Sequence, residues 1–391
     1  MKNFLFTYPV GVLLLLFGAA SCNTGPDPKE TCDFPPGNRE FSWRADTVAW
    51  WPSTLGGVWA FADDDAYVMG SIWKETGEER EFHLGLHWNG EEWSHDINGT
   101  VEEIKHVAND VTGDDYYMVS VGNWSINPPK PGIGEFDNRA KEWKGYQFET
   151  AGELREVWTD GKGFFMAVGD NGMVYTKDGH ETEWVYSKAP TEFNLREIDG
   201  VSKNELYIRG YLSLPAEPVY DQLWKYTGSE WYKLYDNQDT SDIYLYLEGA
   251  MDARYSGVAD VAAWRCPVTD SLQLYIIDNE SFLVSAKGQA LSYEVVNLSE
   301  KGLTLRQNQS NGRSIDLFTP NDVWIYGTRY NFYHWNGSNF QKVIIPGLPN
   351  DDRQFGFQRK MQKTESGKIF FPTEVSPDVY VVVQGVPLSA E

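Results

Sequence analysis

Seven stretches of this chain carry variants of one short motif, and that repetition constrains the fold more than any single residue does. The clearest copies read DDAYVMG, DDYYMVS, GFFMAVG, NELYIRG and NDVWIYG, and weaker copies read LQLYIID and GKIFFPT. Each copy places an aromatic residue shortly after a turn-forming residue: Tyr67, Tyr117, Phe165, Tyr207, Tyr275, Trp324 and Phe370. Successive aromatics lie 42 to 68 residues apart, and a period in the forties with short β-type units is typical of a β-propeller.

Each unit also carries signals for four strands, which we name A to D in chain order. A short apolar run such as GVWAFA (57–62) predicts strand A, and the aromatic lies in strand B. Turns such as HWNGEEW (87–93) and HWNGSNF (334–340) predict a hairpin of strands C and D, because Asn-Gly readily adopts positive φ. With aromatic-rich, alternating segments, the chain is predicted to be all-β, a single propeller of four-stranded blades.

We predict seven blades, with six or eight as alternatives, because the 68-residue interval between Tyr207 and Tyr275 could hide or inflate one unit. The last unit ends at VYVVVQG (379–385) and lacks a fourth strand, whereas residues 40–48 precede the first unit without a sheet of their own. The economical prediction is that residues 40–48 supply strand D of the last blade. That pairing would close the ring and remove an open sheet edge.

The units resemble those of bacterial β-propeller lipoproteins with YVTN- or BNR-type repeats, over about residues 41–386. YTKDGHETEW (175–184) is similar to a degenerate Asp-box turn, with Asp178, Gly179 and Trp184 in place. The resemblance implies a propeller fold. It says almost nothing about activity, because propellers host unrelated functions.

The N-terminus predicts export and anchoring. Lys2 precedes the apolar run VGVLLLLFGAA (10–20), which is too short for a membrane span, and AASC then ends at Cys22. This segment resembles the lipobox of bacterial lipoproteins, which implies lipid attachment at Cys22; ordinary signal-peptidase cleavage is the alternative. Asn23 after the cysteine implies, by the same resemblance, the outer membrane of the cell envelope.

The expected organisation is therefore a lipoprotein signal peptide (1–21), a flexible tether rich in Pro, Gly and acidic residues (22–38) and the propeller (39–391). With Cys22 lipidated, Cys32 and Cys266 remain. An exported compartment permits a disulfide between them, and two unpaired cysteines are the alternative.

Charge and motifs exclude several functions. A formal net charge of −24 argues against nucleic acid and anionic membrane surfaces as partners. His87 and His334 occupy the same place in two HWNG turns, so they are predicted to belong to the repeat. His83 and His87 would lie about 13 Å apart along a strand, too far to chelate one ion. Without zinc spacing, a phosphate loop or a nucleophile elbow, we expect no metal, no cofactor and no catalytic residues.

Extra residues, relative to the shortest units, gather near 71–82, 122–132 and 211–221, between strands B and C, and in 236–256, between strand D and the next strand A. B–C and D–A connections emerge on one face of an up-and-down ring, and clustered insertions often mark the binding face. The candidate ligand-binding residues on that face are aromatic: Trp73, Trp124, Tyr211, Tyr220, Tyr244, Tyr246 and Tyr255. Aromatics bind sugars and proteins alike; packing of the loops onto the ring is the alternative.

The sequence thus favours a non-enzymatic, monomeric envelope lipoprotein that presents loops to a protein or glycan partner. A propeller-type carbohydrate-active enzyme resembling a glycosidase is the alternative, and an assembly factor in an envelope complex is a third possibility. Because strand D starts on the C–D side, the tether should leave from the face opposite the insertions. Cys266, in the A–B connection of the fifth blade, should lie on the tether's face.

Overall fold

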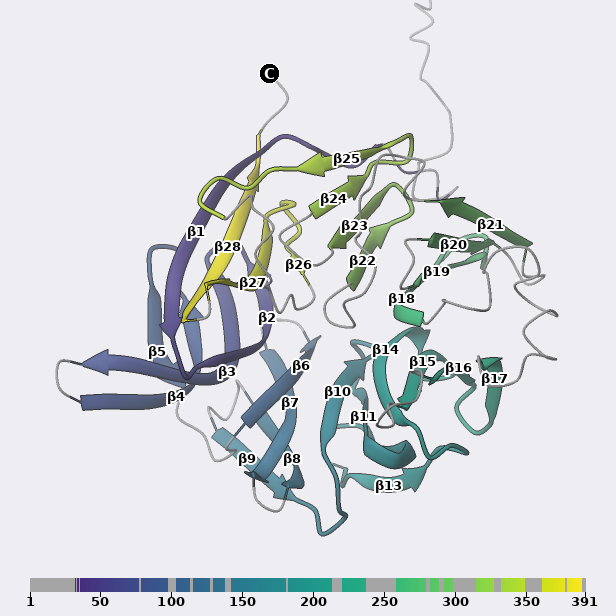
Figure 1. The fold of residues 1–391 in the computed structure, drawn as a ribbon, viewed down its shortest axis with the longest axis horizontal. Coiled ribbons are helices and arrows are strands. Elements are labelled where there is room, and N and C mark those ends of the chain that lie inside the picture. The colour runs from purple at the N-terminus through teal and green to yellow at the C-terminus, as the bar shows by residue number, and fades with distance from the viewer. Residues whose placement is uncertain are drawn as a thin grey trace, which may run out of the picture.

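The computed structural model describes residues 32, 34, 36–76, 79–97, 103–112, 115–126, 129–137, 142–180, 182–212, 220–236, 258–278, 282–287, 292–297, 314–326, 332–348, 361–376 and 378–388. These residues form a single all-β propeller, in which seven four-stranded antiparallel sheets are arranged in a ring (Figure 1). The one helical element within the described ranges is the single-turn 3-10 helix η1 (Asp170–Gly172).

Each sheet, or blade, runs from an inner strand A to an outer strand D. The A strands are β2 (Thr54–Ala62), β6 (Glu103–Thr112), β10 (Leu154–Thr159), β14 (Asn194–Ser202), β18 (Val258–Arg265), β22 (Ser314–Thr319) and β26 (Gln362–Lys363). The B strands are β3 (Asp65–Thr76), β7 (Asp115–Ile126), β11 (Phe164–Gly169), β15 (Glu205–Leu212), β19 (Leu272–Asp278), β23 (Asp322–Tyr326) and β27 (Ile369–Ser376). The C strands are β4 (Glu79–Trp88), β8 (Pro129–Asp137), β12 (Met173–Asp178), β16 (Tyr220–Tyr226), β20 (Phe282–Lys287), β24 (Phe332–Trp335) and β28 (Val379–Pro387). The D strands are β5 (Trp93–Ile97), β9 (Glu142–Gln147), β13 (Val185–Lys188), β17 (Trp231–Asp236), β21 (Ser292–Asn297), β25 (Phe340–Val343) and β1 (Phe41–Trp50).

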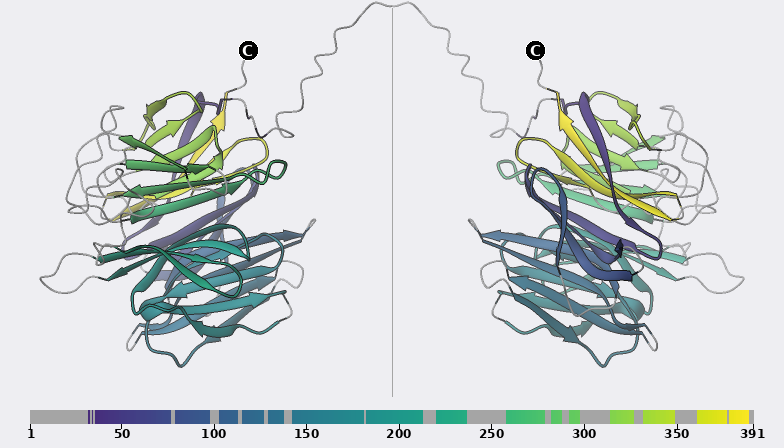
Figure 2. Two further views of the ribbon diagram at one scale, coloured as in Figure 1. Left: turned by 90° about the vertical axis from the view of Figure 1, so that its right-hand side faces the viewer. Right: turned by 90° about the vertical axis from the view of Figure 1, so that its left-hand side faces the viewer.

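We number the blades by their A strands, from blade 1 (β2) to blade 7 (β26). The A strands of neighbouring blades contact one another around the ring axis, as β2 does with β6 and β14 with β18. Figure 2 views the ring from two of its edges. Because all pairing is antiparallel, the A–B and C–D connections lie on one face, which we call the turn face. The B–C and D–A connections lie on the other, which we call the insertion face.

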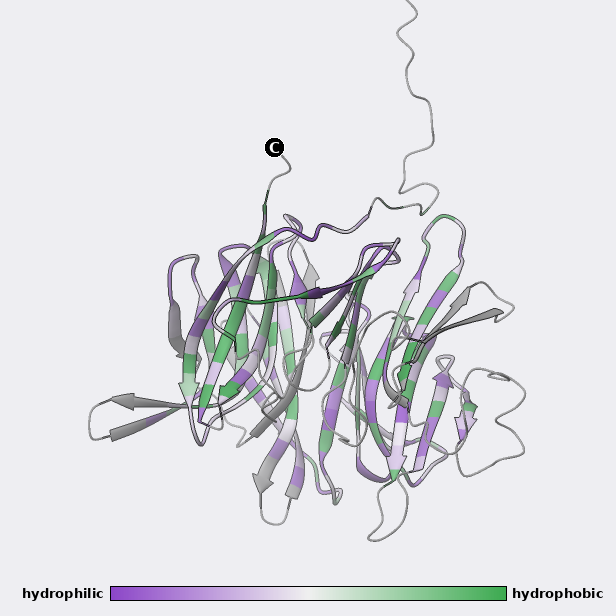
Figure 3. Cartoon of the chain, turned by 45° about the horizontal axis from the view of Figure 1, so that its top comes forward, coloured by the Kyte–Doolittle hydropathy of each residue, from purple (hydrophilic) through white to green (hydrophobic). Residues whose placement is uncertain are grey.

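The hydrophobic core lies between the blades. Alternation along a strand sends side chains to both neighbouring sheets: in β3, Val68 packs with Val382 of blade 7, whereas Met69 packs with Met118 of blade 2. The described residues form one apolar cluster at each junction between neighbouring blades. The hydrophobic segments within the strands are visible in Figure 3. Burial between neighbouring sheets therefore stabilises the ring.

The predicted ring closure is confirmed. β1 pairs antiparallel with β28, with Trp43 opposite Gly385 and Thr47 opposite Val381. The N-terminal strand thus supplies strand D of blade 7, whose order is β26-β27-β28-β1. Any side chain at position 385 would collide with the Trp43 ring, so this pairing requires glycine there.

The prediction that Phe165 is the repeat aromatic of blade 3 is wrong by one residue, because Phe164 occupies the equivalent position. In six blades the strand-B aromatic packs toward the following blade, as Tyr207 does toward blade 5 and Phe370 toward blade 1. In blade 3, Phe165 packs backward against blade 2, and Phe164 faces blade 4. Side chains alternate with period two, so a slip of one residue moves a side chain to the other face of the sheet. Two adjacent phenylalanines conceal such a slip in the sequence.

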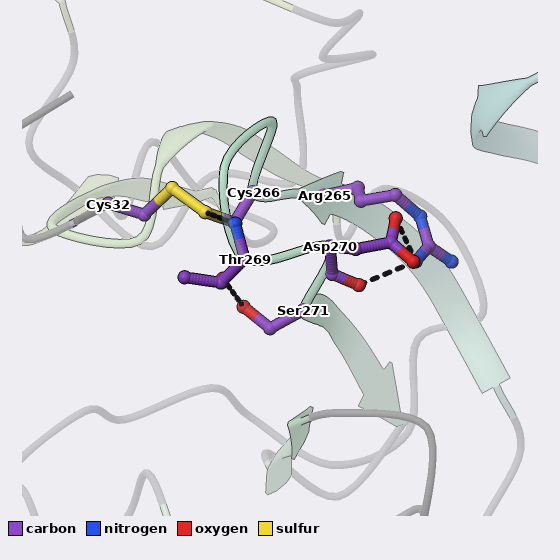
Figure 4. The surroundings of a disulfide bond; sticks show 6 residues. All are labelled: Cys32, Arg265, Cys266, Thr269, Asp270 and Ser271. Carbon is purple, nitrogen blue, oxygen red and sulfur yellow. Dashed lines mark hydrogen bonds and ion pairs between the residues drawn. A yellow bond between two sulfur atoms is a disulfide. The ribbon is translucent and has the colours of Figure 1, made fainter. Parts of the chain in front are cut away.

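The segment before β1 lies on the turn face, as the sequence predicts. We call Cys32, Phe34 and residues 36–40 the strap. Cys32 forms a disulfide with Cys266, with the two Cα atoms 5.9 Å apart. Cys266 follows β18 in the A–B turn of blade 5, where Thr269 donates its backbone N–H to the Cys266 sulfur (Figure 4). Of the two alternatives for these cysteines, the structure contains the bonded one.

The strap then crosses blade 6. The ring of Phe34 meets Trp264 edge-on at 5.5 Å, and its carbonyl accepts from the Asn321 side chain. Gly37 donates its N–H to the Asn321 carbonyl at 2.9 Å. A Cβ at Gly37 would lie 2.8 Å from that oxygen and 3.0 Å from His334 Nε2, so only glycine allows this approach. Arg39 donates to Asn339 in the C–D turn of the same blade.

Candidate functional site

The extra residues of blades 1 and 2 are strand rather than loop. β3 and β4 remain paired out to Thr76 and Glu79, and β7 and β8 out to Ile126 and Pro129. The expectation of loops there is wrong, because the B–C ladders simply continue beyond the ring as hairpins on the insertion face. Residues 213–219 and 237–257, which include Tyr244, Tyr246 and Tyr255, lie outside the described residues.

The structure separates the remaining candidate aromatics. Trp73 is half-buried in blade 1, with its ring 5.2 Å from Phe82 and its backbone N–H bonded to Ser53 Oγ at 2.9 Å. Trp124 lies in β7, and its side chain is outside the described ones. Tyr220 and Tyr211 are half-buried in blade 4, at the insertion-face ends of β16 and β15. Tyr211 lies against the side chains of two arginines.

Two arginines lie over the ring of Tyr211. Arg196 of β14 and Arg209 of β15 are directly opposite in the strand register. The guanidinium carbon of Arg196 lies 4.1 Å from the centre of the Tyr211 ring, and that of Arg209 lies 5.8 Å away. Facing cations normally repel across a sheet. We call Arg196, Arg209, Tyr211 and Arg155 of the adjacent blade the arginine cluster.

Arg209 is neutralised by carboxylates. It donates to Asp221 at 2.7 Å and to Glu197 at 3.2 Å, and all three groups are largely buried. Burial would lower the pKa of Arg209, but the charges of Glu197 and Asp221 raise it above its usual value. Burial raises the pKa of both carboxyl groups, against the opposing charge of Arg209. The charge of Arg209 is therefore compensated within the protein by Glu197 and Asp221.

A β-bulge positions Arg196. The register of β14 with β15 shifts between Arg196 and Ile198, which leaves Glu197 as the extra residue, with φ of 42°. Without the bulge, positions two apart would share one face of the sheet. Here Ile198 packs toward blade 3 while Arg196 lies opposite Arg209. Bulges redirect side chains, and a non-glycine residue in the left-handed region is commoner at functional sites than elsewhere.

Arg155 occupies the equivalent bulge of β10, in blade 3. Its Nε donates to Asp170 of η1 at 2.5 Å, and Glu153 lies 3.4 Å from its Nη2. Burial lowers the pKa of Arg155, but the hydrogen bond and charge of Asp170, with smaller contributions from Tyr211 and Glu153, raise it overall. Arg155 therefore lies near enough to Tyr211 of blade 4 for the two groups to interact electrostatically.

Arg196 differs from the other two arginines. It is half-buried, and no carboxylate forms an ion pair with it within the described part of the chain. Its charge still acts on the adjacent Glu197, where it opposes the rise in the pKa of that carboxyl group. Also on the insertion face, an open pocket of about 560 Å³ lies between blades 3 and 4, lined by residues 188–193 and Gln222.

Sequence reasoning missed the arginine cluster and a pair of tryptophans. The arginines are scattered in sequence, and only strand register and bulges bring them together. Trp50 and Trp51, at the D–A connection from blade 7 to blade 1, are 43% and 59% exposed on the insertion face. Two adjacent tryptophans at the end of a predicted strand D could have indicated an exposed aromatic site. Successive side chains of a strand point to opposite faces of the sheet, so only one of the two can face its interior.

A second charged cluster lies between blades 2 and 3. Lys177 of blade 3 donates to Glu135 of blade 2 at 2.7 Å and to the Tyr117 hydroxyl at 3.0 Å. Trp184 and Tyr146 also donate to the Glu135 carboxylate. Burial and the hydrogen bond to Glu135 raise the pKa of Tyr117 far above its usual value. The side chains of Lys177 and Glu135 are buried, so this ion pair joins the two blades.

The histidines of the HWNG turns behave as structural residues. His87 bonds to Asp65 and His334 to Asp322, each at 2.8 Å, and each imidazole stacks on the strand-B aromatic of its own blade. Within the described ranges, no group of three His, Cys, Asp or Glu side chains is placed to hold a metal ion. The same ranges contain no helix with the length and hydropathy needed to cross a membrane.

Comparison with known proteins shows the fold and no family. No family model matches the chain, and no curated protein does either. The structure is similar to that of YCF48 bound to a D1 peptide, with TM-score 0.54 and 12% identity over 90% of this chain and 99% of that one. It is similar to YCF48 from Cyanidioschyzon merolae, with TM-score 0.54 and 13% identity over 88% and 99%. The WD40 β-propeller domain of Doa1 gives TM-score 0.46 and 12% identity over 86% and 96%.

The protein is thus a β-propeller. At such identities the likeness shows the fold alone. The expected membership of the YVTN or BNR repeat type, and the lipoprotein character that goes with it, stay predictions.

Proposed function

We propose that this protein is a non-enzymatic binding scaffold of the bacterial cell envelope, which holds an extended segment of a partner protein on its insertion face. The observation that carries the proposal is the half-buried arginine cluster at the inner end of blades 3 and 4. It combines the Tyr211 ring with Arg196, which forms no ion pair with a carboxylate within the described part of the chain. Aromatic and arginine side chains contribute most to binding at protein interfaces.

Two further observations support the same face. The extended hairpins of blades 1 and 2 and the exposed Trp50 and Trp51 belong to it. The turn face between blades 5 and 6 is instead occupied by the strap. YCF48, a propeller of similar fold, has a structure with a bound D1 peptide. A peptide partner is therefore favoured over a glycan for this chain.

The proposal can be tested with a bead library of random octapeptides and the fluorescently labelled protein. We expect the protein to retain a subset of beads, and Trp51→Ala to reduce retention about 10-fold or more, because truncating a tryptophan at the centre of an interface costs about 2 kcal/mol or more. Val268→Ala is the matched control, since Val268 is 55% exposed but lies on the turn face. Equal losses in both variants, or no retained beads, would count against a peptide-binding insertion face.

The glycosidase-like alternative has its own readout. Turnover of a glycan substrate that disappears on substitution of a single carboxylate would replace the scaffold proposal with an enzymatic one. Binding on a glycan array without turnover would keep the scaffold role and change the partner class.

Anchoring is proposed through Cys22, which precedes the described residues. We expect Cys22→Ala to abolish incorporation of a radiolabelled fatty acid and to leave the protein unprocessed or soluble, because the thiol is the acylated group in the family that the segment resembles. Cys32→Ala serves as the control and should keep the label. Undiminished labelling of Cys22→Ala would exclude this residue as the lipid site.

The position of the strap gives the proposed orientation. A chain that runs from a lipid to the turn face would hold that face toward the membrane and the insertion face outward. Spin labels at Trp73 and Asn336, on opposite faces, measure this in liposomes. Greater membrane proximity at Trp73 than at Asn336 would reverse the orientation.

A further inference from the structure

We propose that Trp50 and Trp51, with the carboxylate of Asp378 beside them, bind a basic side chain of the partner peptide, an arginine or a lysine. This inference rests on the proposed peptide-binding function and specifies which peptides the insertion face selects. Two observations carry it: a pair of exposed tryptophans on a fixed turn, and the excess of acidic groups next to that turn.

The two tryptophans expose an unusual amount of aromatic surface. Trp51 is more exposed than any other tryptophan whose side chain the structure describes, and Trp50 next to it is also exposed. Burying aromatic surface stabilises a protein by about 25 cal/mol per Å². An adjacent exposed pair leaves that stabilisation unused within the chain, as is typical of a site that contacts a partner.

The turn that carries both rings is held from two sides. The backbone N–H of Trp51 donates to the Asp378 carbonyl at 3.0 Å, in the B–C connection of blade 7. Ser53 donates its N–H to the Trp50 carbonyl at 2.9 Å, and its hydroxyl accepts from the Trp73 N–H of blade 1. The turn is therefore fixed to blades 7 and 1 before a ligand binds, which lowers the entropy lost on binding.

Acidic groups determine which ligand the turn attracts. Asp378 is exposed, and no lysine or arginine of the described ranges forms an ion pair with it. Glu374 lies near it at the end of β27, and both burial and the charge of Asp378 raise the pKa of the Glu374 carboxyl group. Burial and these two carboxylates also raise the pKa of Tyr380. A cation bound at this point would relieve the repulsion between the negative groups.

A basic side chain is the ligand that both parts of the site accept. The face of a tryptophan attracts a cation, and a carboxylate accepts hydrogen bonds from an ammonium or guanidinium group. The aliphatic part of arginine or lysine packs on aromatic surface while its charged end stays at the polar rim. An apolar side chain would cover the rings but desolvate Asp378 without pairing it. The net charge of −24 adds long-range attraction for a basic segment.

The octapeptide bead library tests the proposal when its peptides are N-acetylated, so that only side chains carry positive charge. Beads that wild type retains and Trp51→Leu loses should be at least 3-fold enriched in Arg and Lys over the library. Trp51→Leu keeps an apolar side chain and removes the ring, whereas Trp51→Phe keeps a ring and should lose less binding. Replacing the arginine of a retained peptide with citrulline, its neutral analogue, should weaken binding about 5-fold or more.

The carboxylate has its own variant. Asp378→Asn should weaken binding of the retained peptides about 2- to 5-fold at low salt, the range for a partly exposed ion pair, and the difference should shrink as salt is added. Asp64→Asn is the matched control. Asp64 is also an exposed aspartate in a turn, but it lies between β2 and β3 on the turn face. This control should bind the same peptides as tightly as wild type.

Thermal unfolding of each variant separates loss of binding from loss of folding, and the citrulline comparison needs no variant. If peptides whose retention depends on Trp51 show no excess of basic residues, or bind equally well with citrulline, the inference is wrong and the peptide-binding function stands. Equal binding by a folded Asp378→Asn variant at low salt overturns it as well. If no retained peptide depends on the insertion face, both the inference and the proposed function fail.

Discussion

Replacing Lys177 with methionine should destabilise the protein by about 3–5 kcal/mol, the typical cost of leaving one member of a buried ion pair without its partner. The side chains of Lys177 and Glu135 are 1% and 4% exposed, and they join blade 3 to blade 2. Without the ammonium group, the Glu135 carboxylate would keep only the donors from Trp184 and Tyr146. Urea unfolding followed by tryptophan fluorescence gives the change in midpoint.

The double variant Lys177→Met with Glu135→Gln tests the cause. A neutral amide can accept from Trp184 through its oxygen and donate to the Tyr146 hydroxyl through its nitrogen, so most of the lost stability should return. Lys203→Met, which removes an exposed pair with Asp178, is the control and should barely move the midpoint, because solvent screens that pair. If the single and double variants were equally unstable, lost packing rather than an unpaired charge would be responsible.

The second large effect is expected from the disulfide. Cys32→Ser together with Cys266→Ser should lower the free energy of unfolding by about 2–4 kcal/mol, because the bond closes a long loop, with a sequence separation of 234, in the unfolded chain. Urea unfolding of wild type with and without reductant should reproduce the same difference. The double variant should not respond to reductant.

The disulfide also has a local readout. When it is removed, protease should cut the strap at residues 36–40 before the ring unfolds, since only noncovalent contacts with blades 5 and 6 would still hold it. Thiol labelling under denaturing conditions checks the bond directly: Cys32 and Cys266 should react only after reduction. Their labelling without reductant would show that the protein is made with two free thiols.

The sequence predicted the fold far better than the site. Repeated aromatic residues and Asn-Gly turns indicate strands and hairpins locally. The last unit lacked a fourth strand, which predicted that residues 40–48 would close the ring. Those features are encoded by neighbouring residues. The position of Cys266 on the strap's face followed in turn from strand directions alone.

The site depends on information that local patterns do not contain. Arg196 lies with Arg209 over the Tyr211 ring because β14 carries a bulge, and no composition or spacing marks that bulge. The same limit explains the slip between Phe164 and Phe165, since both residues satisfy the motif. It also explains why longer B–C segments were expected to be loops: a ladder that continues past the ring has the same length as a loop.

The pairing of β1 with β28 has a consequence for the order of folding. The residues that it joins are 329 to 346 positions apart, so this blade is completed only after almost the whole chain has emerged. Contacts of such long range carry a large loop-closure cost and slow the folding of β proteins. Blades 1 to 6 can each form from contiguous sequence, whereas β1 must wait for the C-terminal strands. The slowest folding step should therefore be the joining of the two ends, and until then β1 and the blade 7 sheet both expose strand edges able to pair with other chains.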